Sequence, residues 1–262
     1  TANARADASS KVGENNRWGF FPSTSLAWIL SEEGFLKDVS FLNNLKLRAG
    51  YGVSGNLGAI DSYNSLQLMK PNGVVSVNGA PTVTMGVIRN ANPDLKWEVK
   101  RTFNVGLDAG FFQNRLILAA DYYHAKTSDM LYLYDVSVPP FAYNKLLANL
   151  GSMENSGVEL GLGITPLQKK DMELNINVNV AFQKNKLLSL SGMYNGQYMS
   201  APQYTPIASL NGAGFHGGNN HIVYQIVGES LGVFYLPHCT GLVEQADGSY
   251  RYEVADLNGN GV

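Results

Sequence analysis

Apolar and polar residues alternate without a break between Met172 and Gln183. The even positions are all apolar, and the odd positions are polar except for one alanine. Successive side chains of a β-strand point to opposite faces of its sheet, so this stretch predicts a strand with one apolar and one polar face. Asparagine is a poor strand former, and three asparagines at the odd positions indicate that the polar face borders water.

The same alternation recurs along the chain. It is found in residues 45–54, 97–111, 158–165 and, in short form, 2–7, and less pure stretches of similar length cover 18–30 and 115–131. Arg101 is the one misfit among the apolar positions of its stretch, which is tolerable near a strand end at the level of lipid headgroups. The sequence therefore predicts an all-β chain of about seven or eight long antiparallel strands.

Strands of this kind suit two architectures. A soluble β-sandwich alternates because one face of each sheet is wet, whereas a transmembrane β-barrel alternates between lipid and a polar lumen. Strands of about 10–15 residues suit tilted spans of a bilayer with their extensions. Aromatic residues also gather towards the strand ends, as in the interfacial girdles of barrels: Trp18, Phe20, Phe21, Trp97, Phe111, Phe112, Tyr132 and Tyr134. The barrel is the favoured prediction, and the sandwich is kept as the alternative.

The predicted connections alternate in length as well. Residues 112–115 form a tight hairpin and 165–171 a short turn, whereas long links cover about 56–96, 135–154 and 191–220. Outer-membrane barrels have short periplasmic turns and long external loops, so the long links should lie outside. The link 31–44 then falls on the periplasmic side, where a helical spacing of apolar residues predicts a short helix or helical turn.

Composition excludes several classes of function. The 19 basic and 21 acidic residues give a formal net charge of −2, which argues against a nucleic-acid partner. A single cysteine, Cys239, excludes a disulfide scaffold. No apolar stretch approaches the roughly 20 residues of a membrane helix. No catalytic constellation is singled out by spacing, so we expect no enzyme.

Several phrases in the chain carry a family resemblance. They are Asn16–Ser23 with Ala27 and Trp28, Leu45–Asn56, Asn92–Glu98, Asp121–Tyr123 with Thr127, and Asn149–Leu160. In this order and spacing they resemble the C-terminal barrel half of the SusC/RagA-like TonB-dependent outer-membrane transporters, which are typical of Bacteroidetes. The resemblance extends over almost the whole chain.

The resemblance implies a multi-pass protein of the cell outer membrane, in contact with outer-membrane lipid. Its barrel would have about 22 strands around an N-terminal plug, with a TonB box for energy coupling and a SusD-like surface lipoprotein as a lid. Residues 1–262 are then expected to form part of one β-barrel domain, a fragment without the plug and the TonB box that should not transport alone.

The predicted function is therefore that of a segment of a TonB-dependent importer for oligosaccharides or peptides. The alternative function follows from the other architecture. It is a soluble secreted β-sandwich that binds glycans or mediates adhesion.

Aromatic residues in the predicted external loops are candidates for substrate contact. Their rings could stack on sugar rings or pack on a lid, and ordinary packing within the loops is the alternative for each. The five candidates are Tyr63, Phe141, Tyr143, Tyr198 and Tyr204. Charged residues at the polar positions of the strands are expected to line the lumen, as a solvated wall or as plug contacts rather than as a substrate site; these are Arg48, Lys100, Asp108 and Glu159.

A candidate metal site lies near the end of the sequence. Asp256, Asn258 and Asn260 alternate ahead of Gly261, as in the first half of a calcium loop. An acidic ligand six positions further on would lie past Val262, and an ordinary Asn/Gly-rich turn is the alternative. Calcium is thus the one cofactor that the sequence suggests.

Two features nearby stay open at this stage. His216 and His221 are five positions apart, which permits a weak metal pair. Residues 221–236 are strand-like and either span the membrane or form an external hairpin.

Overall fold

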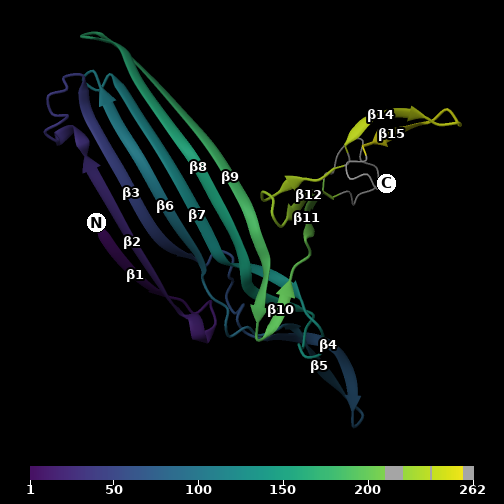
Figure 1. Ribbon diagram of the computed structural model, residues 1–262. Helices are drawn as coiled ribbons and strands as arrows, with labels where there is room; N and C mark the ends of the chain where they lie inside the picture. The colour runs from purple at the N-terminus through teal and green to yellow at the C-terminus, as the bar shows by residue number, and fades with distance from the viewer. Residues whose placement is uncertain (210–220, 237, 256–262) are drawn as a thin grey trace. The chain divides into compact units, whose positions relative to one another are not determined.

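The computed structural model describes residues 1–209, 221–236 and 238–255 of the chain (Figure 1). They fall into two compact units, Thr1–Pro202 and Gln203–Val262, and each is described by itself. The regular structure is almost entirely antiparallel β-strand. In these ranges no helix has the length and apolar character that crossing a membrane requires.

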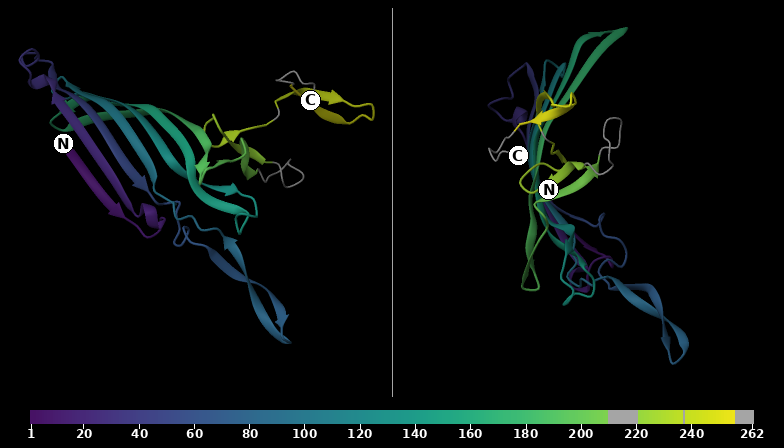
Figure 2. Two further views of the ribbon diagram at one scale, coloured as in Figure 1. Left: turned by 60° about the horizontal axis from the view of Figure 1, so that its bottom comes forward. Right: turned by 90° about the vertical axis from the view of Figure 1, so that its right-hand side faces the viewer.

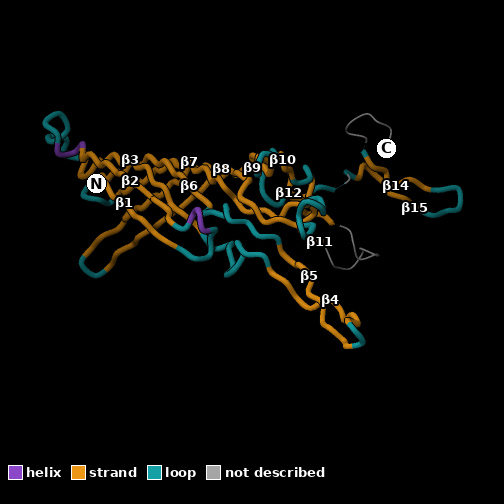
Figure 3. The backbone as a smooth tube through the Cα atoms, turned by 90° about the horizontal axis from the view of Figure 1, so that it is seen from below, coloured by secondary structure: helices purple, strands orange, loops and turns teal. Residues whose placement is uncertain are grey.

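The first unit is built on one eight-stranded antiparallel sheet, seen as a single layer in Figure 3. Its order is β1-β2-β3-β6-β7-β8-β9-β10, so only the step from β3 to β6 skips elements. The bounds are β1 Ala2–Ala8, β2 Trp18–Ile29, β3 Leu42–Asn56, β6 Glu98–Phe111, β7 Leu116–Asp135, β8 Lys145–Lys169, β9 Met172–Tyr194 and β10 Gln197–Ser200.

This single layer is a segment of barrel wall. A sandwich divides its strands between two packed sheets, whereas the seven strands predicted from the alternation all belong to one sheet here. Strands that follow one another up and down through hairpins are the arrangement of membrane barrels. The prediction of an antiparallel barrel segment is confirmed. The sheet is open, with β1 and β10 at its edges.

The strand register gathers the apolar residues on one face of the sheet and the polar residues and glycines on the other. Residues that pair directly across neighbouring strands share a face, so they form rows that run across the sheet. One apolar row is Val105, Tyr122, Val158 and Phe182, and one polar row is Gly106, Asp121, Glu159 and Ala181. We call the two sides the apolar face and the polar face.

The central strands are longer than the alternation predicts. β7, β8 and β9 have 20, 25 and 23 residues, although about 9–11 residues span a bilayer. Their pairing continues to Asp135 and Lys145, so the predicted link 135–154 shrinks to residues 136–144. Likewise β9 runs to Tyr194 and turns directly into β10, within the predicted link 191–220. Both corrections have one physical reason: strands pair through their backbone groups, so pairing can continue where the side chains no longer alternate.

The predicted periplasmic link lies at the same end of the sheet as the two short turns. It begins with the single 3-10 turn η2, Leu30–Glu32, followed by further hydrogen-bonded turns up to Leu42. The prediction of a helical turn is therefore confirmed. The indole Nε1 of Trp28 donates to Glu33 Oε1 at 2.8 Å, which ties this link to the end of β2.

Aromatic rings collect at this end too. Phe41 lies 6.3 Å from Phe111 and 6.2 Å from Phe112 between ring centroids. Trp18 and Phe20 lie at the opposite end of β2 and are highly exposed. Aromatic residues thus mark both ends of the strands, as in the two girdles of a membrane barrel.

The external end of the sheet holds two small apolar clusters. One contains Tyr134, Leu146, Ala148 and Met199, and the other contains Val12, Ile60 and Leu95. Each joins a long strand to a neighbouring loop or turn. Packing between side chains therefore orders the external connections, which have little regular structure of their own.

Replacement of Tyr134 by phenylalanine should leave the free energy of unfolding unchanged or raise it by about 1 kcal/mol. Tyr134 is 1 % exposed, and its hydroxyl has no hydrogen-bond partner among the described residues. A buried unpaired hydroxyl costs more than it contributes. Urea unfolding of the full-length protein measures the change. Tyr194→Phe is the control, since the Tyr194 hydroxyl donates to Asn92 Oδ1 at 3.3 Å and its loss should destabilise.

Two further elements belong to the external side of the first unit. The hairpin of β4 (Leu68–Val77) and β5 (Ala80–Arg89) is inserted between β3 and β6. Figure 2 shows this hairpin extending beyond the ends of those strands. The 3-10 turn η1, Glu14–Asn16, lies in the connection from β1 to β2.

The second unit contains only short strands in its described part. β11 (Tyr204–Ser209), β12 (His221–Ile226) and β13 (Val233–Phe234) form one small sheet, and β14 (Cys239–Glu244) pairs with β15 (Tyr250–Val254). The open question about residues 221–236 is settled by length. β12 has six residues and β13 has two, fewer than a membrane span needs, so they form a hairpin.

Candidate functional site: polar face and external cavity

Three charged side chains on the polar face join three strands. Arg48 of β3 makes a bidentate pair with Asp108 of β6, with Nε–Oδ2 at 2.7 Å and Nη2–Oδ1 at 2.9 Å. The same Nη2 donates to Asp121 Oδ2 of β7 at 3.0 Å. Each of the three is about one-third exposed (31 %, 31 % and 28 %). Charge-assisted bonds of this geometry are strong and directional, so the cluster fixes the strands in register.

A glycine makes this cluster possible. Gly106 is the cross-strand partner of both Arg48 and Asp121. A Cβ at Gly106 would collide with Asp121 Oδ1 and with the guanidinium of Arg48. The absence of a side chain therefore lets the guanidinium lie flat across β6.

The four charged residues predicted to line the lumen all lie on the polar face. The structure brings Arg48 and Asp108 together and adds Asp121, which alternation alone does not single out. Glu159 is the cross-strand partner of Asp121, and Lys100 faces the same side from β6. Three carboxylates, Asp108, Asp121 and Glu159, thus lie beside two cations, Arg48 and Lys46, the second of which is the cross-strand partner of Asp108.

Buried asparagines fasten the external loop to the strands. Asn92 is 2 % exposed, and its Nδ2 donates to the Leu147 carbonyl of β8 at 2.8 Å. Its Oδ1 accepts from the Asp94 backbone N–H at 3.0 Å and from the Tyr194 hydroxyl at 3.3 Å. One side chain thus joins the loop, β8 and β9.

Two further asparagines act in the same way on either side. Asn90 Nδ2 donates to the carbonyls of Tyr143 and Lys145 at 2.6 and 2.8 Å. Asn149 of β8 donates to the Lys96 carbonyl at 2.8 Å and accepts from the Lys96 backbone N–H at 2.9 Å. We call residues 90–98, together with these bonds, the asparagine brace. It satisfies backbone groups of β8 where that strand is no longer paired with β9.

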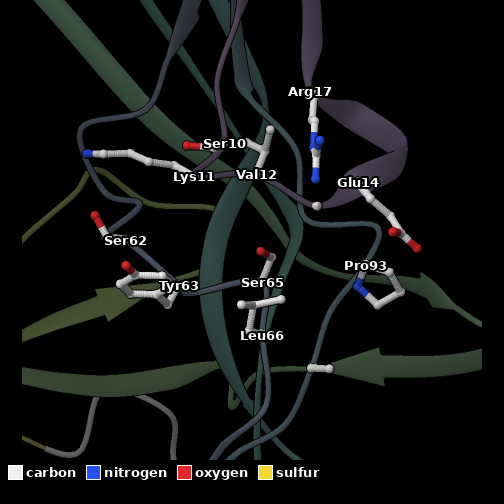
Figure 4. Close-up of a pocket in the computed structure, with 12 residues that line it drawn as sticks. Ser10, Lys11, Val12, Glu14, Arg17, Ser62, Tyr63, Ser65, Leu66 and Pro93 are labelled. Atoms are coloured by element: carbon white, nitrogen blue, oxygen red, sulfur yellow. The ribbon is translucent and has the colours of Figure 1, made fainter.

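An external cavity of about 440 Å³ lies beside the brace (Figure 4). Three segments enclose it: the β1–β2 connection, the loop after β3, and the start of the brace. Its lining combines two cations, one carboxylate, hydroxyl groups and apolar side chains: Ser10, Lys11, Val12, Glu14, Arg17, Ser62, Tyr63, Ser65, Leu66 and Pro93. A mixture of this kind can bind neutral polar ligands by hydrogen bonds and by contact with apolar surface.

A second cavity, of about 560 Å³, opens on the polar face near β1, β2 and β3. Arg5, Asp7, Phe21 and Trp97 are among its lining residues. Phe21 meets Trp97 edge to face with ring centroids 5.4 Å apart. Ser9 lines this cavity, and the next residue, Ser10, lines the external one. The two cavities are therefore neighbours.

Substitution of Gly13 by alanine should detach the β1–β2 connection from the brace. The Gly13 N–H donates to the Leu95 carbonyl at 2.8 Å, and a Cβ there would collide with the backbone carbonyl of Pro93. Overpacking against rigid backbone costs about 1–3 kcal/mol. Limited proteolysis of the full-length protein should show faster cleavage in residues 9–17. Gly34→Ala, where a Cβ meets open space, should leave cleavage unchanged, and equal cleavage in both variants would contradict the contact.

Four of the five aromatic candidates belong to the first unit, where their surroundings differ, and Tyr204 belongs to the second unit. Tyr63 lines the external cavity and is 66 % exposed. Phe141 packs on the Tyr134 cluster, and the backbone of Tyr143 bonds to Asn90. Tyr198 of β10 is exposed, and the ring of Tyr204 in the second unit is tilted against that of Tyr235, with centroids 5.7 Å apart. No ring contact within the described residues joins two of the five, so their role as substrate contacts stays a prediction.

The candidate calcium residues Asp256, Asn258 and Asn260 lie outside the described residues, as does His216. His221 is described, with its Nδ1 2.9 Å from Ser209 Oγ. Across residues 1–209, 221–236 and 238–255, no three His, Cys, Asp or Glu side chains gather as metal ligands would.

Other features of the second unit are local. Cys239 is a free thiol on the surface. In the turn between β14 and β15 the hydroxyl and backbone N–H of Ser249 donate to Asp247, which holds the pKa of that carboxyl below its usual value.

The comparisons with known proteins agree with this geometry. The family described as "TonB dependent receptor-like, beta-barrel" matches residues 1–261. The chain belongs to the TonB-dependent receptor family. It is 34 % identical to the TonB-dependent receptor SusC of Bacteroides thetaiotaomicron over 200 residues, which are 76 % of this chain and 20 % of that protein. It is 37 % identical to the TonB-dependent receptor P39 of Formosa agariphila over 204 residues, 76 % of this chain and 19 % of P39.

Solved structures give the same result. The RagAB peptide importer in its open-open state has a TM-score of 0.75 and 25 % identity, over 97 % of this chain and 26 % of that one. A further RagAB peptide transporter structure has a TM-score of 0.71 and 28 % identity, over 93 % and 24 %. The SusC/RagA-like resemblance is therefore confirmed, and this receptor chain spans about a fifth of the curated relatives it matches.

The phrases that carry the family resemblance have structural roles in this receptor chain. Asn92 and Leu95 belong to the brace, and Leu95 is fully buried. Glu98 Oε1 accepts from the Leu131 backbone N–H at 3.0 Å, beside an irregularity in β7. Asn149 closes the brace from β8. The alternation of apolar and polar residues does not predict these roles, because Asn92, Glu98 and Asn149 each bind backbone groups of a segment that is distant in sequence.

Proposed function

We propose that this chain forms part of the wall of an outer-membrane importer. The observation that carries the proposal is the separation of an apolar and a polar face over seven neighbouring strands, β1, β2, β3, β6, β7, β8 and β9. In a membrane the apolar face meets lipid and the polar face borders an aqueous lumen, because every backbone group of a closed barrel is paired. Residues 1–262 are then part of one barrel domain in a multi-pass protein of the cell outer membrane.

The substrate class follows from the two cavities and from the relatives. Oligosaccharides and peptides both offer many hydrogen-bonding groups beside apolar surface, which matches the mixed lining of the external cavity. The RagAB structures similar to this chain are described as those of a peptide importer. We therefore propose import of oligosaccharides or peptides, with Tyr63 at the cavity as the aromatic contact that the described geometry supports best.

The β4–β5 hairpin supports a protein partner on the external side. Residues 71–88 contain no charged side chain. Large apolar residues of both strands are nevertheless exposed, including Val74, Val75, Val83 and Met85. An isolated two-stranded hairpin is marginally stable in water, and an exposed apolar patch of this kind marks an interaction surface. We propose that a SusD-like surface lipoprotein covers it, and that energy comes through TonB, a plug and a TonB box in the rest of the protein.

A growth experiment tests the import function. Bacteria that lack the full-length receptor should fail to grow on one oligosaccharide or peptide mixture as sole carbon or nitrogen source, while growth on monosaccharides or free amino acids continues. Complementation with the intact receptor should restore growth. A Tyr63→Ala receptor should need a higher nutrient concentration. Normal growth of the deletion strain on every oligomer tested, with the receptor absent from the outer-membrane fraction of the parent strain, would refute the proposal.

A further inference from the structure

Three cations and one carboxylate lie side by side on the apolar face, just beyond its external edge. Arg101 of β6 pairs with Lys126 of β7, and Lys126 pairs with Glu154 of β8. Glu154 in turn pairs with Lys186 of β9. The four side chains therefore form one row across four neighbouring strands. Strands lie about 4.8 Å apart, so the row is about 15 Å wide. We call it the cationic row.

The register fixes the level of the cationic row. Two positions towards the periplasmic end, the same strands carry Phe103, His124, Ser156 and Lys184. Two positions further on comes the fully apolar row that contains Tyr122 and Phe182. Aromatic residues at the edge of an apolar band mark the headgroup level of a membrane barrel. The cationic row and Lys184 therefore lie where lipid headgroups begin, on the side that meets lipid.

The charge of this region is not neutralised within the sheet. The three cations of the row and the neighbouring Lys184 make four cations beside one carboxylate, Glu154. In the described part of the chain none of these five groups belongs to an ion pair. Arg101, Lys126, Lys184 and Lys186 are all exposed. Arg101 Nη1 donates to Ser128 Oγ at 2.9 Å, which leaves further N–H groups of its guanidinium free to donate.

We propose that the cationic row binds phosphate groups on the headgroup of an outer-leaflet lipid. This proposal rests on the proposed function, because it requires the apolar face to meet lipid. Guanidinium and ammonium groups are the side chains that bind phosphate, the first in bidentate geometry and the second as a point charge. The acyl chains of the same lipid lie along the apolar rows on the periplasmic side of the cationic row. One lipid therefore contacts both the cationic row, through its phosphates, and the apolar rows, through its acyl chains. A free phosphate ion would satisfy only the upper part.

The full-length receptor, purified in a nonionic detergent, is tested with three probes. They are bis-phosphorylated lipid A, the same lipid A without its phosphates, and inorganic phosphate. Native mass spectrometry counts the lipid molecules retained and gives an apparent dissociation constant for each probe. The wild type should prefer the phosphorylated lipid over the dephosphorylated lipid, and high salt should reduce that preference.

The decisive variant neutralises the row: Arg101→Gln, Lys126→Gln and Lys186→Gln. The matched control neutralises one arginine and two lysines of the polar face: Arg5→Gln, Lys46→Gln and Lys100→Gln. Each cation near an anionic lipid surface contributes about fivefold to binding, so the row variant should bind the phosphorylated lipid about 100-fold more weakly. The control should bind it like the wild type. Heat-modifiable migration on gels confirms that each variant is folded.

The possible failures are distinguishable. If wild type and row variant retain both lipids equally, the receptor contacts lipid but the row is not a phosphate site. If the control loses as much affinity as the row variant, the effect is one of net charge and the proposal is wrong. If inorganic phosphate competes as well as the lipid, the site binds a free anion only. If neither lipid is retained at all, the proposed membrane location itself fails.

Discussion

Ala120→Arg should destabilise the receptor strongly, and Ala119→Arg, one residue away on β7, should not. Ala120 lies in the apolar row with Leu107, Leu160 and Val180. Arginine at the middle of the lipid-facing band of a barrel costs about 2–4 kcal/mol. The free energy of unfolding in urea, with the full-length receptor refolded into lipid vesicles, measures the effect.

Ala119 offers a matched control on the polar face. Its cross-strand partners are Asp108 and Gly161. A long cationic side chain there has a carboxylate and a glycine as cross-strand neighbours and borders water, so the free energy of unfolding should stay within about 0.5 kcal/mol of the wild type. Equal losses in the two variants would show that the faces are not lipid and water. A larger loss for Ala119→Arg would reverse the assignment of inside and outside.

Asn92→Ala should have the largest effect among substitutions in the external part of the chain. The variant loses bonds to the Leu147 carbonyl, the Asp94 N–H and the Tyr194 hydroxyl. Buried backbone groups left without partners cost about 1–3 kcal/mol each, so we expect a loss of about 3–5 kcal/mol. Hydrogen exchange should become faster in residues 90–98 and at the external ends of β8 and β9.

Two further variants sharpen this test. Asn92→Asp keeps the shape but has no N–H for the Leu147 carbonyl, so it should be at least as damaging as alanine. Asn15→Ala removes a single exposed bond to Asp94 Oδ1 of 3.0 Å and should change stability by less than about 0.5 kcal/mol. A mild effect of Asn92→Ala, similar to that of Asn15→Ala, would show that the brace does not hold the external loop.

The strands of this receptor chain could be predicted wherever one face meets lipid. Residues 172–183 show this best, because a strand with one face in lipid needs an apolar side chain at every second position. Beyond Phe182 that demand ends, and the sequence gives no sign that β9 continues to Tyr194. The predicted external link was too long for the same reason.

The candidate site was less accessible from the sequence. Arg48 and Asp108 are recognisable as polar-face residues, but their bidentate pair and the addition of Asp121 depend on how β3, β6 and β7 are aligned. Phe141 and Tyr143 look like exposed loop aromatics. In the structure Phe141 packs in a small apolar cluster, and the backbone of Tyr143 is hydrogen-bonded to Asn90 of the brace.

The sequence by itself determined the class of fold, the two faces of each strand and the alternation of short and long connections. These properties are local, since they depend on alternation within one strand and on the length of one link. Only the tertiary structure decided the alignment between strands, and with it the Arg48 cluster, the asparagine brace and the cationic row. Each of these joins residues tens of positions apart, and a shift of one residue in register would move every side chain to the other face.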